Sequence, residues 1–422
     1  MFKKIKVILI LLFLSAAVSA QNITGSPFSA FGYGVIEDLS TGTAQSFGGA
    51  SVGLSLADEI NTQNPAGYGA IPRQTFLFNA GLKGRQVTYD NGITNATKYD
   101  NGFTGLNAAF NIAEHWSAGF GIMPYSSIGY KIKTQDSIFF DDLSYGTSTN
   151  YYGEGGLNKI YLATAFNYEG FSAGIDFSYI FGVLGARIES AVTDNFHSGF
   201  LLNTNNLNIS GLYMTYGLQY KHNISESQRI TIGATYNHTS NLKSRRTQFT
   251  KTVLTNQYTN VTDTLVQDTL FGLNAQLPQA YAVGISYQTK KWLFAADYSS
   301  KMWEGITVEE RPVSELTNSY KVSGGIEYAP SLTPENYLQA MRYRIGGYYT
   351  NEYILVNGNP LNAYALTFGI GLPAGKSRTM INLGFEIGQK GDINKNLLKE
   401  TYYGLNVSLN MSDIWFVQRK FD

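Results

Sequence analysis

The sequence predicts an all-β protein, a transmembrane antiparallel β-barrel of about fourteen strands with an N-terminal hatch inside the lumen. Three observations predict this class. Only 15% of the 422 residues are charged, against about 25% in ordinary soluble domains. Tyr, Phe and Gly are abundant, with 30, 25 and 44 residues. Beyond residue 21 no apolar run is long enough for a transmembrane helix, whereas apolar residues recur at every second position.

The first twenty residues have the features of a secretory signal peptide. Three lysines precede an apolar run over 7–18, and small residues follow at 18–20. This pattern predicts a signal peptide over 1–20 that is cleaved before Gln21. Its apolar core is too short to span a bilayer as a helix, which argues against a retained anchor. Because the chain has no Cys, lipoprotein anchors, disulfides and thiolate metal sites are excluded.

Strand-like alternation recurs from about residue 74 to residue 410. Between 381 and 388, apolar side chains fall on one face and small or polar side chains on the other, and 171–181 repeats the pattern. A soluble β-sandwich array would show the same alternation. The apolar faces often end in aromatic residues, however, as they do at the interfacial girdles of a membrane barrel. These aromatic residues are Tyr168, Tyr179, Tyr220, Tyr236, Tyr287, Trp292, Tyr298, Tyr328 and Tyr349.

The links between strands support a barrel over a sandwich. The predicted strand cores are 74–89, 99–112, 116–133, 157–168, 170–187, 206–221, 228–243, 279–289, 291–303, 318–329, 340–350, 361–372, 378–390 and 400–410. Links after even-numbered strands are mostly short, and links after odd-numbered strands are mostly long and polar: 134–156, 188–205, 244–278 and 304–317. Short periplasmic turns alternate with long outer loops in outer-membrane barrels. We therefore expect the barrel over 73–411, followed by a periplasmic tail over 412–422.

Residues 21–72 do not continue the strand pattern. They are rich in Gly, Ser, Thr and Ala, with apolar residues scattered among them. Their apolar content is too high for a disordered tail, which is the alternative. We expect this segment to fold as a hatch, or plug, inside the barrel lumen.

A family resemblance rests on this segment. The stretch Ser46-Phe47-Gly48-Gly49-Ala50 precedes Asp58 and then Asn64-Pro65-Ala66-Gly67. This order resembles the hatch of the FadL/OmpP1/TodX family of outer-membrane hydrophobic-compound transporters. The resemblance implies a fourteen-stranded barrel with an N-terminal hatch and a kinked third strand, here at Met123-Pro124-Tyr125. The chain looks like a Bacteroidota member, some of whose relatives resemble subunits of secretion or barrel-assembly machinery.

Two segments that contain proline are candidate functional sites. Asn64, Pro65, Ala66 and Gly67 are predicted as a hatch hinge that gates the lumen, or alternatively as a rigid joint, since turn chemistry alone explains the residues. Pro124 removes a backbone donor from a strand, so we expect a kink in the wall there. That kink is either a lateral opening for an apolar ligand or a plain β-bulge.

Charged residues at inward positions form the third candidate site. Lys321, Arg342 and Arg344 are predicted to face the lumen, where a ligand carboxylate would bind their donors. The alternative is that they pair with the hatch or with the inward carboxylates Asp176, Asp297, Glu327 and Glu386, because charges in such barrels are usually paired.

The predicted function is uptake of hydrophobic small molecules, of the long-chain fatty acid or aromatic hydrocarbon type, across the outer membrane. The alternative is a non-transporting barrel that serves as a protein-binding subunit of a secretion or outer-membrane assembly complex. The expected partners are outer-membrane lipid, a hydrophobic ligand and other envelope proteins. The net charge of zero gives no reason to expect nucleic acid. Four isolated His and the absence of G-x-S-x-G and H-E-x-x-H motifs predict no enzyme, metal or cofactor.

Overall fold

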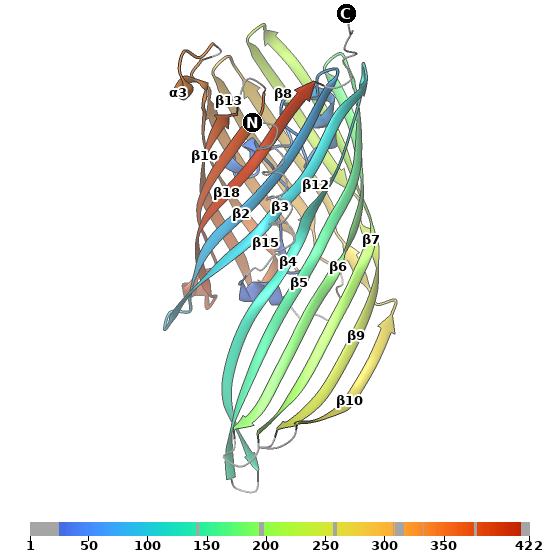
Figure 1. The fold of residues 1–422 in the computed structure, drawn as a ribbon, viewed down its shortest axis with the longest axis vertical. Coiled ribbons are helices and arrows are strands. Elements are labelled where there is room, and N and C mark those ends of the chain that lie inside the picture. The colour runs from blue at the N-terminus through green and yellow to red at the C-terminus, as the bar shows by residue number, and fades with distance from the viewer. Residues whose placement is uncertain are drawn as a thin grey trace, which may run out of the picture.

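The computed structural model describes residues 25–140, 143–193, 198–255, 260–306, 308, 316–331, 333–374 and 378–414. Within these residues antiparallel strands form a single sheet, which closes where the last strand pairs with the first strand of the wall. The wall has fourteen strand positions, so the predicted fold class is confirmed (Figure 1). The described helices are short, and none is long and apolar enough to cross a membrane.

The wall strands follow each other in chain order around the barrel. They are β2 (Thr75–Asp90), β3 (Asn95–Ala113), β4 (Trp116–Phe140), β5 (Leu143–Tyr168), β6 (Phe171–Thr193), β7 (Ser198–Ser225), β8 (Gln228–Asn237), β12 (Gln279–Gln288), β13 (Trp292–Met302), β14 (Ser319–Tyr328), β15 (Arg342–Val356), β16 (Asn359–Pro373), β17 (Met380–Lys390) and β18 (Lys399–Ile414). β9 (Ser240–Thr255) continues the course of β8 along β7. β10 (Asn260–Phe271) and β11 (Ala275–Leu277) then pair with β9.

Side chains of the wall alternate between lipid and lumen. On β6, Phe177 and Tyr179 are exposed on the outside, while Ser178 between them is buried on the inside. Aromatic rings gather near the short turns, where the ring centroids of Trp292 and Tyr328 are 4.6 Å apart. This arrangement matches the apolar band and aromatic girdle of a transmembrane barrel.

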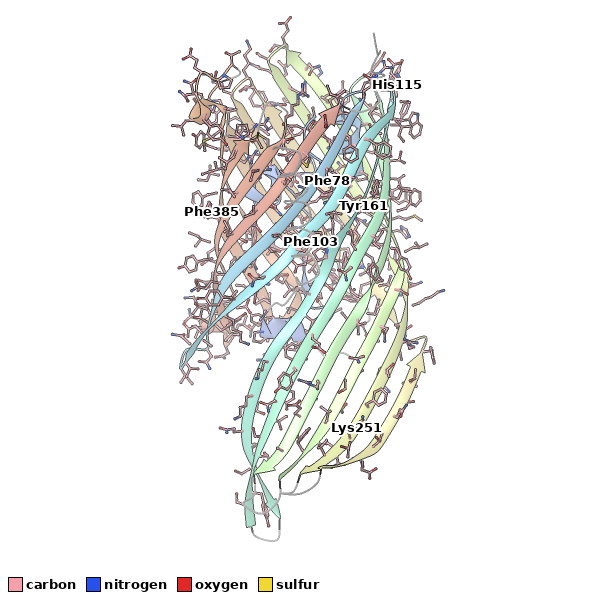
Figure 2. The ribbon with its side chains drawn as sticks, viewed as in Figure 1. Phe78, Phe103, His115, Tyr161, Lys251 and Phe385 are labelled. Atoms are coloured by element: carbon pink, nitrogen blue, oxygen red, sulfur yellow. The ribbon has the colours of Figure 1, made fainter. Side chains whose placement is uncertain are left out.

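Six strands continue far beyond the rest of the barrel as one sheet. We call this sheet the extension: 128–140 of β4, 143–155 of β5, 184–193 of β6, 198–210 of β7, 243–255 of β9, and β10. It projects at the bottom of Figure 1, at the end opposite the short turn that holds His115 in Figure 2. The sequence predicts loops over 134–156, 188–205 and 244–278, and this prediction is wrong for most of these residues, which form strands. Polar residues lie on both faces of these strands, so the apolar alternation that identifies a wall strand is missing.

The hatch crosses the lumen as a chain of short elements. These are the 3-10 helix η1 (Pro27–Ala30), β1 (Val35–Ile36), α2 (Thr43–Ser46) and the 3-10 helix η2 (Pro65–Ala70). η1 lies against β4, α2 against β15 to β17, and η2 against β4 to β7. The predicted signal peptide and residues 415–422 of the predicted tail lie outside the described residues. The remainder of that tail segment, 412–414, belongs to β18 and pairs with β2.

Candidate functional site in the plugged lumen

Glycines on the inner wall allow the hatch to lie directly on the strands. A Cβ atom at Gly174 of β6 would lie 2.5 Å from the carbonyl carbon of Pro65. A Cβ atom at Gly325 of β14 would lie 2.6 Å from the ring of Phe47. Both distances are far below van der Waals contact, so a side chain at either position would push the hatch away from the wall. The inner face of the wall, where glycines leave room for the hatch backbone, is therefore the surface on which the hatch packs.

The predicted hinge lies in a buried joint between hatch and wall. Its residues Asn64, Pro65, Ala66 and Gly67 are all buried. The Oδ1 atom of Asn64 accepts from the backbone N–H of Ala66 at 3.0 Å. Its Nδ2 atom donates to the carbonyl oxygens of Val52 in the hatch, at 2.8 Å, and of Leu218 on β7, at 3.2 Å. The Asn64 side chain thus forms hydrogen bonds both within the hatch and to the wall strand β7.

The pairing of the wall is interrupted beside Pro124. In the pairing of β3 with β4, Ala113 is opposite Trp116 at one end and Leu106 is opposite Ile122 at the other. Within the described residues the pairing ends at Leu106 and Ile122. The register between β4 and β5 shifts between Pro124 and Ser126. Such a shift is the mark of a β-bulge. Pro124 therefore lies at a bulge next to the place where β3 and β4 separate.

The hatch strand β1 covers the edge of β4 that this separation leaves free. Val35 pairs with Ser127, and Ile36 pairs with Ser126. The backbone N–H of Glu37 donates to the carbonyl oxygen of Tyr125 at 3.0 Å. The hydroxyl of Ser127 donates to the Glu37 carboxylate at 2.7 Å. The hatch is therefore joined to the wall by strand pairing at the point where a lateral opening would begin.

Aromatic side chains fill the end of the lumen that faces the extension. The Trp303 ring has no exposed surface, and its centroid lies 4.4 Å from the Tyr353 ring and 6.0 Å from the Tyr33 ring. The Tyr353 hydroxyl donates to the carbonyl oxygen of Gly34 at 2.6 Å. Residues of the hatch and of the wall together form this cluster.

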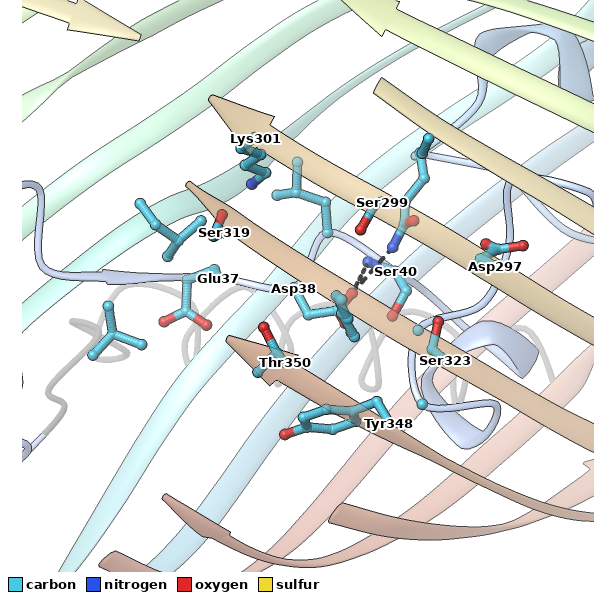
Figure 3. A pocket seen from close by; sticks show the side chains of 18 of the residues that line it. Glu37, Asp38, Ser40, Asp297, Ser299, Lys301, Ser319, Ser323, Tyr348 and Thr350 are labelled. Atoms are coloured by element: carbon cyan, nitrogen blue, oxygen red, sulfur yellow. Dashed lines mark hydrogen bonds and ion pairs between the residues drawn. The ribbon is translucent and has the colours of Figure 1, made fainter. Parts of the chain in front are cut away.

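A cavity of about 350 Å³ lies between the hatch and the inner wall (Figure 3). Charged pairs line it. Lys321 binds Asp38, Lys83 binds Glu37, and Arg85 donates to Glu386 at 3.1 Å. Hydroxyl groups of Ser299, Ser319, Ser323 and Thr350 add to this lining. Apolar and aromatic side chains, among them Ile36, Leu39 and Trp303, complete a lining of mixed character.

Each cation predicted to bind a ligand carboxylate is bound to a carboxylate of the chain. Lys321 binds Asp38, as above, and Arg342 donates to Asp58 at 2.9 Å. The guanidinium of Arg344 is fully buried and donates to Glu327 at 2.7 Å. This is the pairing that the sequence left open as an alternative. The Asp of the hatch motif, Asp58, is one of the partners.

Carboxylates of the hatch respond to these cations in different ways. Burial raises the pKa of Asp38, but Lys321 and Ser40 outweigh it and lower the pKa to about 2. Burial likewise raises the pKa of Glu37, and Lys83 and Ser127 reverse the effect and lower that pKa below its ordinary value. Glu59 differs, because burial outweighs Arg344 and leaves its pKa raised. The ionised forms of Asp38 and Glu37 therefore stabilise the hatch–wall contact.

The sequence did not identify several residues of this contact. Asp297 is the clearest case: it was predicted to face inward, but its partner was not. Its carboxylate accepts from the backbone N–H groups of Ser51 at 2.5 Å and Val52 at 2.7 Å. Lys83 and Trp303 were missed altogether. Lys83 could have been found from its inward position within the predicted strand 74–89. Nothing local marked Trp303.

Fold and site together define a transmembrane β-barrel with N-terminal residues packed against its inner wall. The family model BamG matches residues 1–422. The chain therefore belongs to the BamG family. No curated protein sequence matches it.

Solved structures that superpose on this chain include proteins described as toluene transporters. The Pseudomonas putida toluene transporter TodX superposes with a TM-score of 0.58 at 14% identity, over 90% of this chain and 100% of that one. A Pseudomonas aeruginosa FadL homologue gives 0.57 at 9% identity, over 89% and 98%. The Ralstonia pickettii toluene transporter TbuX gives 0.55 at 14% identity, over 91% and 98%. At these identities the likeness establishes a FadL-like barrel fold, which the resemblance in the sequence predicted.

Proposed function

We propose that this chain is a sealed outer-membrane barrel that acts as a protein-binding subunit of a secretion or outer-membrane assembly complex. The observation that carries the proposal is the attachment of the hatch on several sides. Strand pairing holds it to β4, carboxylates and cations hold it across the lumen, and an aromatic cluster contains residues of both hatch and wall. A transport cycle would have to break these contacts in each turnover.

The extension supports a partner-binding role. A β-sheet normally buries at least one face against another layer, because a single layer leaves its side chains in water. On β10 both faces are exposed, including the large apolar side chains of Leu265, Leu270 and Phe271. Exposed apolar side chains on an edge strand are typical of sites that pair with another chain. Membership in the BamG family is compatible with this role.

Uptake of hydrophobic small molecules is the second candidate. It is supported by the fold that this chain shares with proteins described as toluene transporters and a monoaromatic hydrocarbon channel. The break in pairing beside Pro124 would provide a lateral exit if β1 left the edge of β4. In this role Asn64 to Gly67 would act as the hinge.

One experiment separates the two roles. The full chain, tagged and cross-linked in intact cells, is purified in a mild detergent, and uptake of a radiolabelled fatty acid and of toluene is measured in a deletion strain. We expect stoichiometric recovery of a partner protein and unchanged uptake. A monomeric protein without a partner, together with reduced uptake in the deletion strain, would reject the subunit role in favour of transport.

A further inference from the structure

The outward face of the extension carries an excess of positive charge. Paired residues on neighbouring strands share a face, so the outward row that contains Phe177, Tyr179 and Phe181 on β6 continues to Arg187 and Glu189. The described part of this face, read across the paired strands, contains six cations and two carboxylates. The cations are Lys131, Lys133, Arg187, Lys243, Arg245 and Lys251, and the carboxylates are Glu154 and Glu189.

These cations are accessible and partly ordered by aromatic rings. Lys131, Lys133, Lys243 and Arg245 are exposed. The side chain of Arg187 is 50% exposed and forms an ion pair with Glu189 at 3.4 Å. The Arg187 guanidinium lies over the Tyr152 ring at 4.5 Å, and the Lys131 ammonium approaches the same ring at 5.5 Å. Tyr152 thus places two cations side by side on one surface. Lys251 lies on the same face, on the projecting sheet in Figure 2.

The position of the cations along the strands indicates what they meet. On β6 the lipid-facing aromatic row ends at Phe181, and Arg187 follows only a few residues later on the same face. Farther out, the rung of Gln135, Ser148, Ala191 and Phe200 carries no charge on this face. Lys131 and Arg187 therefore lie near the end of the lipid-facing band, whereas Lys251 lies farther out on the projecting sheet (Figure 2). A binding site for an acidic protein would have no reason to follow the edge of the lipid-facing band.

We propose that this face binds the phosphate groups of a glycolipid in the outer leaflet. Arg and Lys bind phosphate through charge-assisted hydrogen bonds, and basic residues beside a membrane surface are attracted to anionic headgroups. The inference rests on the outer-membrane placement proposed above, with the extension on the outer side. Bound glycolipid would fix the height and tilt of the extension above the bilayer, which would present its remaining surfaces to a partner.

The test uses the full-length protein in a neutral detergent and native mass spectrometry. The probes are lipid A with two, one or no phosphates, and phosphatidylglycerol. The variant K131Q/R187Q/K251Q removes three cations from the face. The matched control R73Q/K290Q/K291Q removes three exposed or half-exposed cations at the short-turn end of the barrel. Heat-modifiable migration on gels verifies that each variant is folded.

We expect diphosphorylated lipid A to bind and its affinity to fall by about a hundredfold in the triple variant, at about fivefold per cation. The control should keep the affinity of the native protein, and dephosphorylated lipid A should bind no better than background. Equal binding of all three lipid A forms, or full competition by phosphatidylglycerol, would overturn the assignment. A variant that loses a co-purified acidic protein but keeps its lipid would also overturn it. The lipid-binding measurement needs only the purified protein. Its result is therefore independent of the partner-capture experiment, and either proposal can be rejected while the other stands.

Discussion

Removal of the Asp297 carboxylate should release the hatch from the wall without unfolding the barrel. In Asp297→Ala, the backbone N–H groups of Ser51 and Val52 lose an acceptor that lies 2.5 and 2.7 Å away. A buried donor left without an acceptor costs about 1–3 kcal/mol. Two such donors give about 2–6 kcal/mol, and removal of a buried charge offsets part of this. We therefore expect the opening free energy of the 50–54 segment to fall by about 3 kcal/mol.

Hydrogen exchange of the hatch amides measures this change directly. A loss of about 3 kcal/mol corresponds to exchange about 150-fold faster at Ser51 and Val52. Asp176→Ala is the control, because Asp176 is equally buried in the wall but binds Lys159, at 2.7 Å, and not a hatch amide. That variant should weaken the barrel and leave exchange at 51–53 within a few-fold of native. If exchange at Ser51 and Val52 in Asp297→Ala stays within threefold of the native rate, the proposed attachment is refuted.

Three further outcomes are expected. Gly325→Ala places a Cβ atom 2.6 Å from the Phe47 ring, so it should lower unfolding stability in urea by about 1–3 kcal/mol, whereas the neighbouring Gly324→Ala meets nothing closer than 3.1 Å and should be near neutral. Trp303→Ala should cost about 3–5 kcal/mol in the same assay and make the hatch segment near Tyr33 sensitive to protease, since it empties the outer aromatic cluster. Because the pKa of Asp38 is lowered to about 2 from 3.8, its stabilisation is complete above about pH 4 and is lost as the pH falls towards 2. Pepsin cleavage near residues 37–40 should therefore increase between pH 4 and pH 2, while cleavage near Glu59, whose pKa is raised, should not; the same increase at both places would contradict the assignment.

The wall was predictable because lipid on one side and a small-residue lumen on the other impose a two-residue period on every strand. The extension escaped prediction for the complementary reason. Its Thr, Ser, Asn and Tyr residues meet water on both faces, and without a lipid-facing side the period disappears. β4 was expected to end near 133 and runs to Phe140.

The hatch was predicted as an element from its apolar content and motif, but its contacts were not. The partners are far apart in the sequence: Asp297 and Ser51 are separated by 246 positions. Local pattern can place a charge on an inward face, as it did for Arg344, but it cannot say which carboxylate lies opposite. Which carboxylate lies opposite a given cation depends on the path of the hatch across the lumen, and that path is seen only in the three-dimensional structure.

A covalently fixed hatch tests the central claim most directly. Val35 and Ser127 are directly opposite in an antiparallel pair, where Cα atoms are about 4.5–5.5 Å apart, a distance that a disulfide can bridge. Since the native chain has no Cys, V35C/S127C forms one bond only, between hatch and wall. We predict that the oxidised variant retains its partner protein and complements a deletion strain as well as the native chain. Loss of complementation on oxidation, with recovery on reduction, would contradict the sealed-barrel account and show that the hatch must move.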